Sequence, residues 1–493
     1  MRPRSRGRNR LPLVVVVFWS LVVASRAAAA EEPPSRPSGK TPPNIVVIVI
    51  DELGYYELSC MGHPILRTPH IDRMAAEGMR FTQALAGGCV CAPTRSTLMT
   101  GKHLGHTTVR DNPGGTPLKA DDFTVADMLR RAGYATGGFG KWGLGDRGTT
   151  GVPERHGFDI FFGYYHQVHA HTFFPKYLLR NSELIALPGN TDAYDDGETF
   201  SQYRIFDEAL RFIRENKDRP FFAYLPWTPP HGRWGMPEND PSYQLYKNAD
   251  WARDCKNPRD AIIYAAMVNL VDRQVGAVLD LLKQLDLDER TIVFFSGDNG
   301  GNPYFADEMH PAGLFGPNVD PKTGKRFRGG KGNLYEGGLR IPMIVRWPGR
   351  IAPGTVSDHL WYFPDMMPTL AELAGAEAPS DTDGISIVPT LLGPEAAGRP
   401  QARHEYLYWE SAKQTAVRSG QWKLIRQAPQ RPWELYDLHA DVEETRDVAD
   451  EHPEVVERLA RFAQDAHEPN VVGEWLDRSK GFRPAPGVSS YQP

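Results

Sequence analysis

The sequence predicts an α/β protein: a large, mostly parallel β-sheet sandwiched by helices, with a small α+β subdomain at the C-terminus. From Asn44 onward, short β-branched runs alternate with amphipathic helical stretches, which is typical of a parallel sheet covered on both faces. Two of the runs, 44–50 (NIVVIVI) and 291–296 (TIVFFS), are mainly apolar without alternation, as strands buried on both faces are. Near His404 this alternation gives way to several short strand patterns and one helix.

The elements of the large domain follow from the period of their apolar residues. Weaker strand patterns lie at residues 135–140, 221–225 and 342–347. Helical patterns lie at residues 69–77, 122–132, 198–215, 259–285 and 365–373. In the C-terminal subdomain we expect strands at 406–409, 416–418, 422–426 and 433–436, followed by a helix at 453–466. The predicted domains are 44–403 and 404–493.

The N-terminal residues have the pattern of a signal peptide. Five arginines between Arg2 and Arg10 precede an apolar run at 11–24 and a run of alanines at 27–30. The apolar run is shorter than the roughly 20 residues of a membrane span, and no stop-transfer segment follows. We therefore expect residues 1–30 to be removed and the protein to be exported, periplasmic or secreted, without stable membrane insertion; an uncleaved anchor is the alternative. Residues 31–43 are Pro-rich and polar, and read as a linker.

Composition excludes several classes of protein. The chain has 493 residues, 41% of them hydrophobic and 24% charged, which excludes a disordered, collagen-like or polytopic membrane protein. Residues 1–30 carry six Arg and no acid, so the mature chain has 50 basic against 61 acidic residues, a net charge of −11. That balance gives no indication of nucleic-acid binding. Four cysteines are too few for a disulfide scaffold, although one pair is enough for a single bridge.

Polar residues follow four predicted strands at the point where each ends. Asp51-Glu52, Asp298-Asn299, Lys141 and His231 occupy these positions. Because ligands bind at the carboxyl ends of parallel strands, we expect these side chains to share one edge of the sheet. Carboxylate and amide oxygens favour a hard divalent cation, calcium before magnesium. Taken singly, Asp and Asn are more often helix caps or turn residues, but their occurrence at two strand ends favours a metal.

The most specific motif is Cys91-Ala92-Pro93-Thr94-Arg95, followed by Thr100-Gly101. Here the sequence resembles the formylglycine-dependent sulfatases (type I, arylsulfatase-like, of the alkaline phosphatase superfamily), whose hallmark is Cys-X-Pro-X-Arg. The resemblance implies that a formylglycine-generating enzyme oxidises Cys91 to formylglycine (3-oxoalanine), whose hydrate is the nucleophile. Cys89 does not fit the motif.

The predicted start of a helix at this motif agrees with a nucleophile at residue 91. Pro93 suits the first turn of a helix running through Met99, which would place residue 91 at the positive end of the helix, facing an anionic ester. Arg95, one turn further, would hold the nucleophile and the metal-binding carboxylates.

The resemblance extends from Asn44 to about Ala466 and assigns the remaining roles. Its segments are Asp51 to Tyr55, Gly140-Lys141-Trp142, Pro230-His231, Gly297 to Gly300, and Gly330-Lys331-Gly332 before Tyr335-Glu336-Gly337-Gly338. It implies that Asp51, Asp298, Asn299 and the modified Cys91 bind calcium. It implies that Lys141, Lys331 and His231 hold the sulfate, and that His231 protonates the leaving alcohol.

Two positions depart from the family pattern. Glu52 stands where the family usually has a second Asp, and its longer side chain ligates the metal only if the backbone shifts. Gly143 stands where the family usually has a histidine that helps the covalent intermediate expel sulfate. His169 and His171 follow soon after, and one of them is a candidate for the missing base and for substrate binding; a surface or strand-edge pair is the other interpretation.

The resulting hypothesis is a sulfuric ester hydrolase. The combination of Gly-Lys-Trp-Gly with His-Ala-His resembles a sulfatase subgroup associated with carbohydrate sulfates, of galactose or N-acetylgalactosamine type. Two alternatives remain at this point. The first is a phosphonate monoester or phosphodiester hydrolase of the same superfamily. The second is a non-catalytic binder of sulfated glycans, suggested by Glu52 and Gly143.

Overall fold

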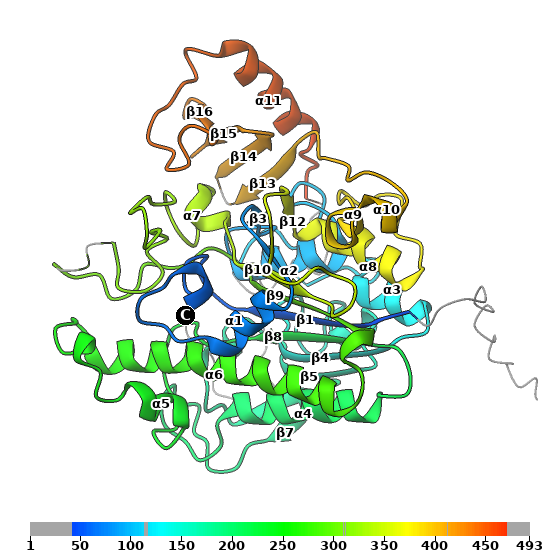
Figure 1. Ribbon diagram of the computed structural model, residues 1–493, viewed down its shortest axis with the longest axis vertical. Helices are drawn as coiled ribbons and strands as arrows, with labels where there is room; N and C mark the ends of the chain where they lie inside the picture. Colours follow the sequence, from blue (N-terminus) through cyan, green and yellow to red (C-terminus); the bar gives the residue numbers. More distant parts are fainter. Residues whose placement is uncertain (1–41, 113–116, 309, 311, 412, 471–493) are drawn as a thin grey trace, which may run out of the picture. The chain divides into compact units, whose positions relative to one another are not determined.

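The computed structural model describes residues 42–112, 117–308, 310, 312–411 and 413–470 (Figure 1). In this part of the chain, ten strands form one sheet in the order β11-β2-β10-β9-β1-β8-β4-β5-β6-β7. The strands are β1 (Asn44–Ile50), β2 (Met79–Phe81), β4 (Ala135–Lys141), β5 (Ile160–Tyr164), β6 (Tyr177–Arg180), β7 (Glu183–Ala186), β8 (Phe221–Trp227), β9 (Thr291–Gly297), β10 (Met343–Arg346) and β11 (Thr355–Ser357). The predicted signal peptide lies outside the described residues, as does most of the predicted linker.

The sheet is parallel at its centre and mixed at its edges. Strands β9, β1, β8, β4 and β5 are parallel neighbours, which confirms the predicted fold class. On one side β10 runs antiparallel to β9, although its sequence reads like the parallel strands. On the other side β6 and β7 continue the sheet antiparallel. These edge strands are short and carry more polar residues, so their sequence did not reveal them.

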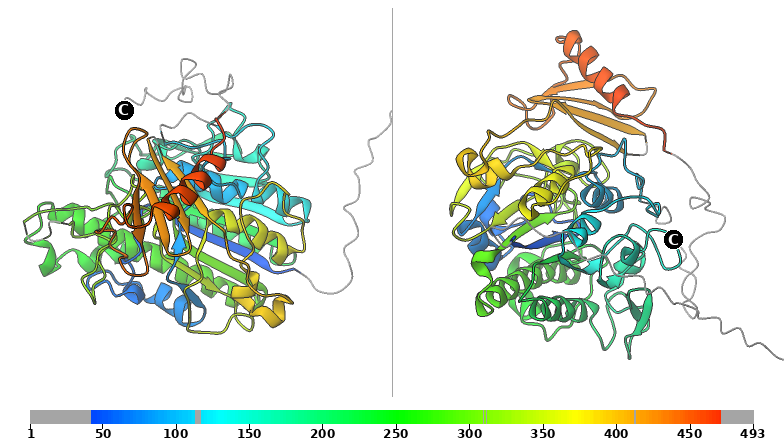
Figure 2. Two further views of the ribbon diagram at one scale, coloured as in Figure 1. Left: turned by 90° about the horizontal axis from the view of Figure 1, so that it is seen from above. Right: turned by 90° about the vertical axis from the view of Figure 1, so that its right-hand side faces the viewer.

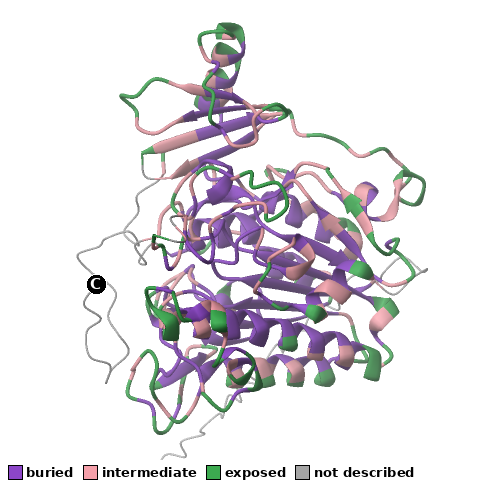
Figure 3. Cartoon of the chain, turned by 60° about the vertical axis from the view of Figure 1, so that its left-hand side comes forward, coloured by how far each residue is buried: buried purple, intermediate pink, exposed green. Residues whose placement is uncertain are grey.

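Helices cover both faces of the sheet (Figures 1 and 3). The helices of this domain are α1 (Pro69–Ala76), α2 (Cys91–Thr100), α3 (Val125–Arg131), α4 (Ser201–Glu215), α5 (Pro241–Tyr246), α6 (Pro258–Gln284), α7 (Glu336–Leu339), α8 (Met366–Ala374), α9 (Val388–Leu392) and α10 (Pro394–Ala397). Alternate residues of β1 point to opposite faces: Val46 and Ile48 pack with α1, α4 and α6, while Ile45 and Val47 pack with α2, α3 and α8. Burial on both sides explains why β1 is mainly apolar.

Helix α6 is long and apolar enough to cross a membrane by length and composition. However, 83% of its most apolar 18-residue window is buried inside the protein. Its apolar residues form part of the core beneath the sheet, so α6 has the character of a core helix of a globular domain.

A second, four-stranded antiparallel sheet follows near the C-terminus (Figure 2). It consists of β13 (Leu407–Ser411), β14 (Gln414–Ser419), β15 (Trp422–Arg426) and β16 (Glu434–Asp437), with helix α11 (Pro453–Asp465) on its outer face. Its other face packs Trp409 and Ile425 against Leu85 and Tyr362, which lie in the two-stranded sheet of β3 (Ala84–Leu85) and β12 (Trp361–Tyr362). The predicted boundary at 403/404 lies in the connection before β13.

Candidate active site

The polar residues predicted from the strand ends lie together at the carboxyl edge of the central strands. Asp51 follows β1 directly, Lys141 is the last residue of β4, and Asp298 follows β9. Cys91 is the first residue of α2, and His231 lies four residues beyond the end of β8. Five segments that are far apart in sequence therefore contribute to one buried cluster.

Cys91 is fully buried, and its Sγ donates a hydrogen bond to Asp51 Oδ1 over 3.1 Å. Burial, reinforced by the negative charge of Asp51, raises the pKa of the Cys91 thiol well above its ordinary value. Because the thiolate is the nucleophilic form, the unmodified cysteine would be a poor nucleophile at neutral pH.

Helix α2 brings Arg95 to the same cluster. Every residue of this ten-residue helix is buried, so its position is fixed by packing on all sides. Arg95 Nη2 lies 2.9 Å from Asp298 Oδ2, and Nη1 donates to the carbonyl of Lys141 over 2.6 Å. The guanidinium thus connects the ends of β9 and β4 to the helix that carries Cys91.

Two aspartates of the cluster have pKa values shifted in opposite directions. Burial alone would raise the pKa of Asp51, but Lys141, whose Nζ lies 2.6 Å from Asp51 Oδ2, together with His231 and Arg95 lowers it well below its usual value. Burial, followed by the charge of Asp51, raises the pKa of Asp298 to about 7. Two carboxylates in this position are both ionised more readily if a cation lies between them.

Oxygen donors in the cluster fit a hard divalent cation. Asn299 Oδ1 is buried and has no hydrogen-bond partner among the described residues, which leaves its lone pairs free for a ligand. Ligand atoms of Asp51, Cys91 and His231 lie within 4.8 Å of one another. Aspartate and amide oxygens of this kind are the usual ligands of calcium.

Glu52 points toward the lysine and histidine side of the cluster. Its φ of 62° is a left-handed conformation, which a non-glycine residue adopts at a cost on the order of 1–3 kcal/mol. The carboxylate contacts Lys331 Nζ and the Tyr304 hydroxyl, and its Oε1 lies 3.0 Å from His231 Nε2. Tyr304 is a site residue that the sequence did not indicate. Glu52 as a metal ligand stays a prediction.

The three candidate histidines occupy different environments. His231 is buried, its Nε2 lies 3.1 Å from Lys331 Nζ, and burial lowers its pKa. The ring of His171 stacks on the ring of His231. His169 instead packs its ring against Tyr164 and Tyr177. The structure therefore brings His171, and not His169, to the cluster.

At Gly143, where the resemblance implies a histidine, a side chain would meet the carboxamide of Gln167. Its φ is +79°, and a Cβ built there would lie 2.7 Å from Gln167 Oε1. Gln167 Nε2 contacts Asn112 Oδ1, which also accepts a hydrogen bond from the backbone N–H of Ala92 over 3.1 Å. Gln167 and Asn112 are further site residues without a sequence signal, because neither belongs to a motif.

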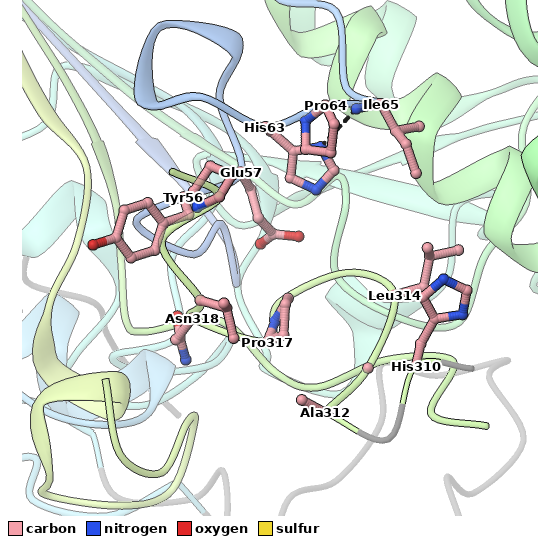
Figure 4. A pocket seen from close by; sticks show the side chains of 13 residues that line it. Tyr56, Glu57, His63, Pro64, Ile65, His310, Ala312, Leu314, Pro317 and Asn318 are labelled. Carbon is pink, nitrogen blue, oxygen red and sulfur yellow. Dashed lines mark hydrogen bonds between the residues drawn. The ribbon is translucent and has the colours of Figure 1, made fainter. Parts of the chain in front are cut away.

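The loop after Asp51 and Glu52 also borders a separate cavity of about 340 Å³ (Figure 4). Its lining includes Tyr56, Glu57, His63, His310 and Leu314, and none of the candidate catalytic residues. Figure 4 shows the Glu57 carboxylate pointing into this space. Its oxygens accept hydrogen bonds from the backbone of Gly54 and Gly316 and from the Tyr264 hydroxyl. Glu57 therefore holds in place the loop that follows Asp51 and Glu52.

A second group of possible metal ligands, formed by His103, His106 and Asp383, is better explained as structural. His103 Nδ1 accepts a hydrogen bond from the backbone N–H of Gly105, so the neutral ring carries its proton on Nε2 and offers no lone pair there. His106 Nδ1 lies 2.9 Å from both oxygens of Asp383. Asp383 thereby holds the turn that follows α2.

Comparison with known proteins agrees with this geometry. Residues 43–376 match the family model "Sulfatase", and residues 327–467 match "N-sulphoglucosamine sulphohydrolase, C-terminal". Human arylsulfatase A is 33% identical over 413 residues (78% of this chain, 74% of the relative), and N-acetylgalactosamine-6-sulfatase of Canis lupus familiaris is 31% identical over 429 residues (80% and 74%). A solved Bacteroides thetaiotaomicron structure, described with the metabolism of multiple glycosaminoglycans, superposes with a TM-score of 0.70 at 26% identity over 86% of this chain and 99% of that chain. The chain belongs to the sulfatase family, the enzymes that hydrolyse sulfate esters.

Proposed function

We propose that this sulfatase removes sulfate from a sulfated carbohydrate, using formylglycine formed from Cys91 and a calcium ion bound by Asp51, Glu52, Asp298 and Asn299. The observation that carries the proposal is the position of Cys91. It is the first residue of a buried helix, within the Cys-X-Pro-X-Arg motif, and it hydrogen-bonds Asp51. A buried thiol with a raised pKa makes a poor catalyst, whereas a hydrated aldehyde at the same position presents hydroxyl groups to the metal side of the cluster.

The calcium ion would supply positive charge to neutralise the nucleophile and one sulfate oxygen. Around it, Arg95 orients the side chain of residue 91 through its own fixed contacts with Asp298 and Lys141. Lys141 and Lys331 bear the sulfate oxygens on which negative charge develops, because a fixed cation in a buried site needs no reorganisation during the reaction.

Two histidines divide the proton transfers. His231 donates a proton to the departing sugar oxygen, since it lies beside Lys331 at the sulfate-binding end of the cluster. His171, stacked on His231, would accept the proton that must leave residue 91 before sulfate is released. This assigns to His171 the role left open by the glycine at position 143.

The carbohydrate substrate is supported by the relatives. Two of them are named for an N-acetylgalactosamine sulfate and for glycosaminoglycan metabolism, and a galactose- or N-acetylgalactosamine-type sulfate is the substrate class we propose. The N-terminal pattern supports an exported enzyme, periplasmic or secreted, that meets the formylglycine-generating enzyme during maturation. Sequencing the N-terminus of the mature protein tests the export proposal.

Mass spectrometry of the peptide spanning Cys91 tests the central proposal. After co-expression with a formylglycine-generating enzyme, we expect loss of sulfur and gain of an aldehyde; an unmodified thiol in fully active protein would refute it. Turnover of an aryl sulfate against an aryl phosphonate separates the sulfatase from a phosphonate hydrolase of the same fold. Binding of sulfated glycans without turnover by the modified protein would indicate a non-catalytic binder.

A further inference from the structure

Gln167 occupies the space that a side chain at position 143 would fill. Gly143 lies two residues after Lys141, and the point where its Cβ would stand is 2.7 Å from Gln167 Oε1 and 3.7 Å from Arg95 Cδ. Gln167 is buried, in the segment that also carries His171. The carboxamide therefore faces the catalytic cluster from a part of the chain distant from the Cys91 motif.

The orientation of this carboxamide is fixed by its neighbour. Asn112 Oδ1 accepts a hydrogen bond from the backbone N–H of Ala92, and a backbone N–H only donates. The Gln167 atom that contacts the same oxygen must then be the donor Nε2. Gln167 Oε1 consequently faces Gly143.

Gln167 Oε1 is buried and has no hydrogen-bond partner among the described residues. Buried polar groups in native proteins are nearly always hydrogen-bonded, so this acceptor indicates a missing donor. A hydroxyl can supply that hydrogen bond. The acceptor lies near the first turn of α2, since Asn112, which Gln167 contacts, holds the N–H of the residue after Cys91.

We propose that Gln167 accepts a hydrogen bond from a hydroxyl of the hydrated formylglycine at position 91, and thereby holds the aldehyde in its hydrated form. This inference rests on the proposed function, because it requires the aldehyde. The Gln167 oxygen thus takes over, from another part of the chain, the place beside the nucleophile that Gly143 leaves empty.

The test measures hydration of the aldehyde directly. An aminooxy probe reacts with the free aldehyde and not with its hydrate, so the labelling rate of folded protein reports the hydration equilibrium, and labelling after denaturation gives total aldehyde. In Gln167→Leu we expect labelling to be about three- to tenfold faster than in the wild type, as loss of one hydrogen bond implies. With an aryl sulfate, kcat should fall while KM stays close to the wild-type value.

Two variants separate this role from simple packing. Gln167→Glu keeps an acceptor at the same place, so its labelling rate should stay nearer the wild type than that of Gln167→Leu. Gln202→Leu is the matched control: Gln202 is equally buried, and its Nε2 donates to Gln274 Oε1 over 2.7 Å, between α4 and α6. It should lower the melting temperature and leave labelling unchanged.

The outcomes distinguish this inference from the proposed function. If wild-type protein contains no aldehyde, both are wrong. If the aldehyde is present and Gln167→Leu is labelled at the wild-type rate, the inference alone is wrong, and an ordered water satisfies Gln167 Oε1 instead. If Gln202→Leu accelerates labelling as much as Gln167→Leu does, the effect is a general loss of packing, and the inference is again wrong.

Discussion

The imidazole rings of His171 and His231 stack with their centroids 4.1 Å apart and their planes 15° from parallel. Burial, followed by the positive charges of Lys141 and His231, lowers the pKa of His171 to about 2. Its Nε2 is buried without a hydrogen-bond partner among the described residues. His171 is therefore neutral at working pH, and as a base it depends on a nearby negative charge, such as that of the bound sulfate ester, to raise this pKa. His231 is already engaged with Lys331 and Glu52.

The first prediction concerns this division of roles. His171→Ala should lower kcat about 10²- to 10⁴-fold, as loss of a general base does, and should lower KM with it, because kcat/KM reports the first half-reaction, which does not use this base. Because the base acts after the sugar has left, the variant should release one equivalent of aryl alcohol in a burst and then stall as a sulfated protein. Stopped-flow absorbance and intact-protein mass spectrometry measure these two effects.

His169→Ala is the matched control from the same segment. His169 packs against Tyr164 and Tyr177, away from the cluster, so its removal should lower the melting temperature and preserve kcat. A burst in His169→Ala and none in His171→Ala would reverse the assignment.

The second prediction concerns the nucleophile. Cys91→Ala should abolish turnover of any sulfate ester. Relative to the unmodified protein, the free energy of unfolding should fall by only about 1 kcal/mol, because the substitution removes one sulfur atom and its weak hydrogen bond to Asp51. Thermal unfolding and an aryl sulfate assay check this result. Substantial residual turnover would show that another group attacks sulfur.

The third prediction concerns the metal. Adding calcium to chelator-treated wild-type protein should restore activity and raise the melting temperature, since a ligand at 100 times its Kd stabilises the folded state by about 2.7 kcal/mol. Asn299→Leu should lose the temperature shift because it lacks the free Oδ1. Asn299→Asp, which keeps an oxygen at this position, should retain it. If calcium raised the melting temperature of both variants equally, Asn299 would not be a ligand of the ion.

The central part of the fold could be predicted because burial leaves a strong sequence signal. Strands β1 and β9 are covered on both faces, and their residues are accordingly mainly apolar. The direction of β10 could not be predicted, because a short buried strand has the same composition whether its neighbour is parallel or antiparallel. Strands β6 and β7 have four residues each, and β7 is largely exposed at the sheet edge, so neither leaves a clear pattern.

The candidate site could be predicted where residues belong to a motif or end a strand. Cys91 and Arg95 belong to the Cys-X-Pro-X-Arg motif, and Asp298 directly follows β9, so the sequence alone was enough to propose them. The contacts of Glu52 with Tyr304 and of Gln167 with Asn112 depend on loops that meet only in the folded protein. For the same reason, the sequence could not decide between His169 and His171, which lie two residues apart on one short turn.

The fourth prediction concerns attachment of the C-terminal sheet. Lys423 on β15 is fully buried, with its Nζ 3.1 Å from Glu336 Oε1 and 2.8 Å from Glu444 Oε1. Lys423→Met keeps the volume but leaves the two carboxylates without this cation, so it should lower the free energy of unfolding by about 3–5 kcal/mol. Urea denaturation measures the change. The exposed pair of Arg446 and Glu451 provides a control, because Arg446→Met should change stability by less than about 1 kcal/mol.

The fifth prediction concerns Glu57, which holds in place the loop that follows Asp51 and Glu52. Burial raises the pKa of Glu57 from 4.5 to about 7, although three hydrogen-bond donors oppose the shift. Between these two pH values the folded protein binds a proton that the unfolded chain has lost. Stability should therefore fall as pH rises from about 4.5 to 7 and level off above, with this residue contributing on the order of 3 kcal/mol.

Glu57→Gln isolates that contribution. The amide places its NH₂ group against one of the donors, so the variant should be less stable than wild type by about 1–3 kcal/mol at pH 5. Its stability should fall less steeply from pH 5 to 7, because the residue no longer titrates. Other buried acids with raised pKa values, such as Asp272, are present in both proteins, so their effects cancel in the difference. Urea unfolding at half-unit pH steps gives the slope of the free energy of unfolding against pH for each protein. Equal slopes in wild type and Glu57→Gln would mean that the three donors keep Glu57 ionised throughout.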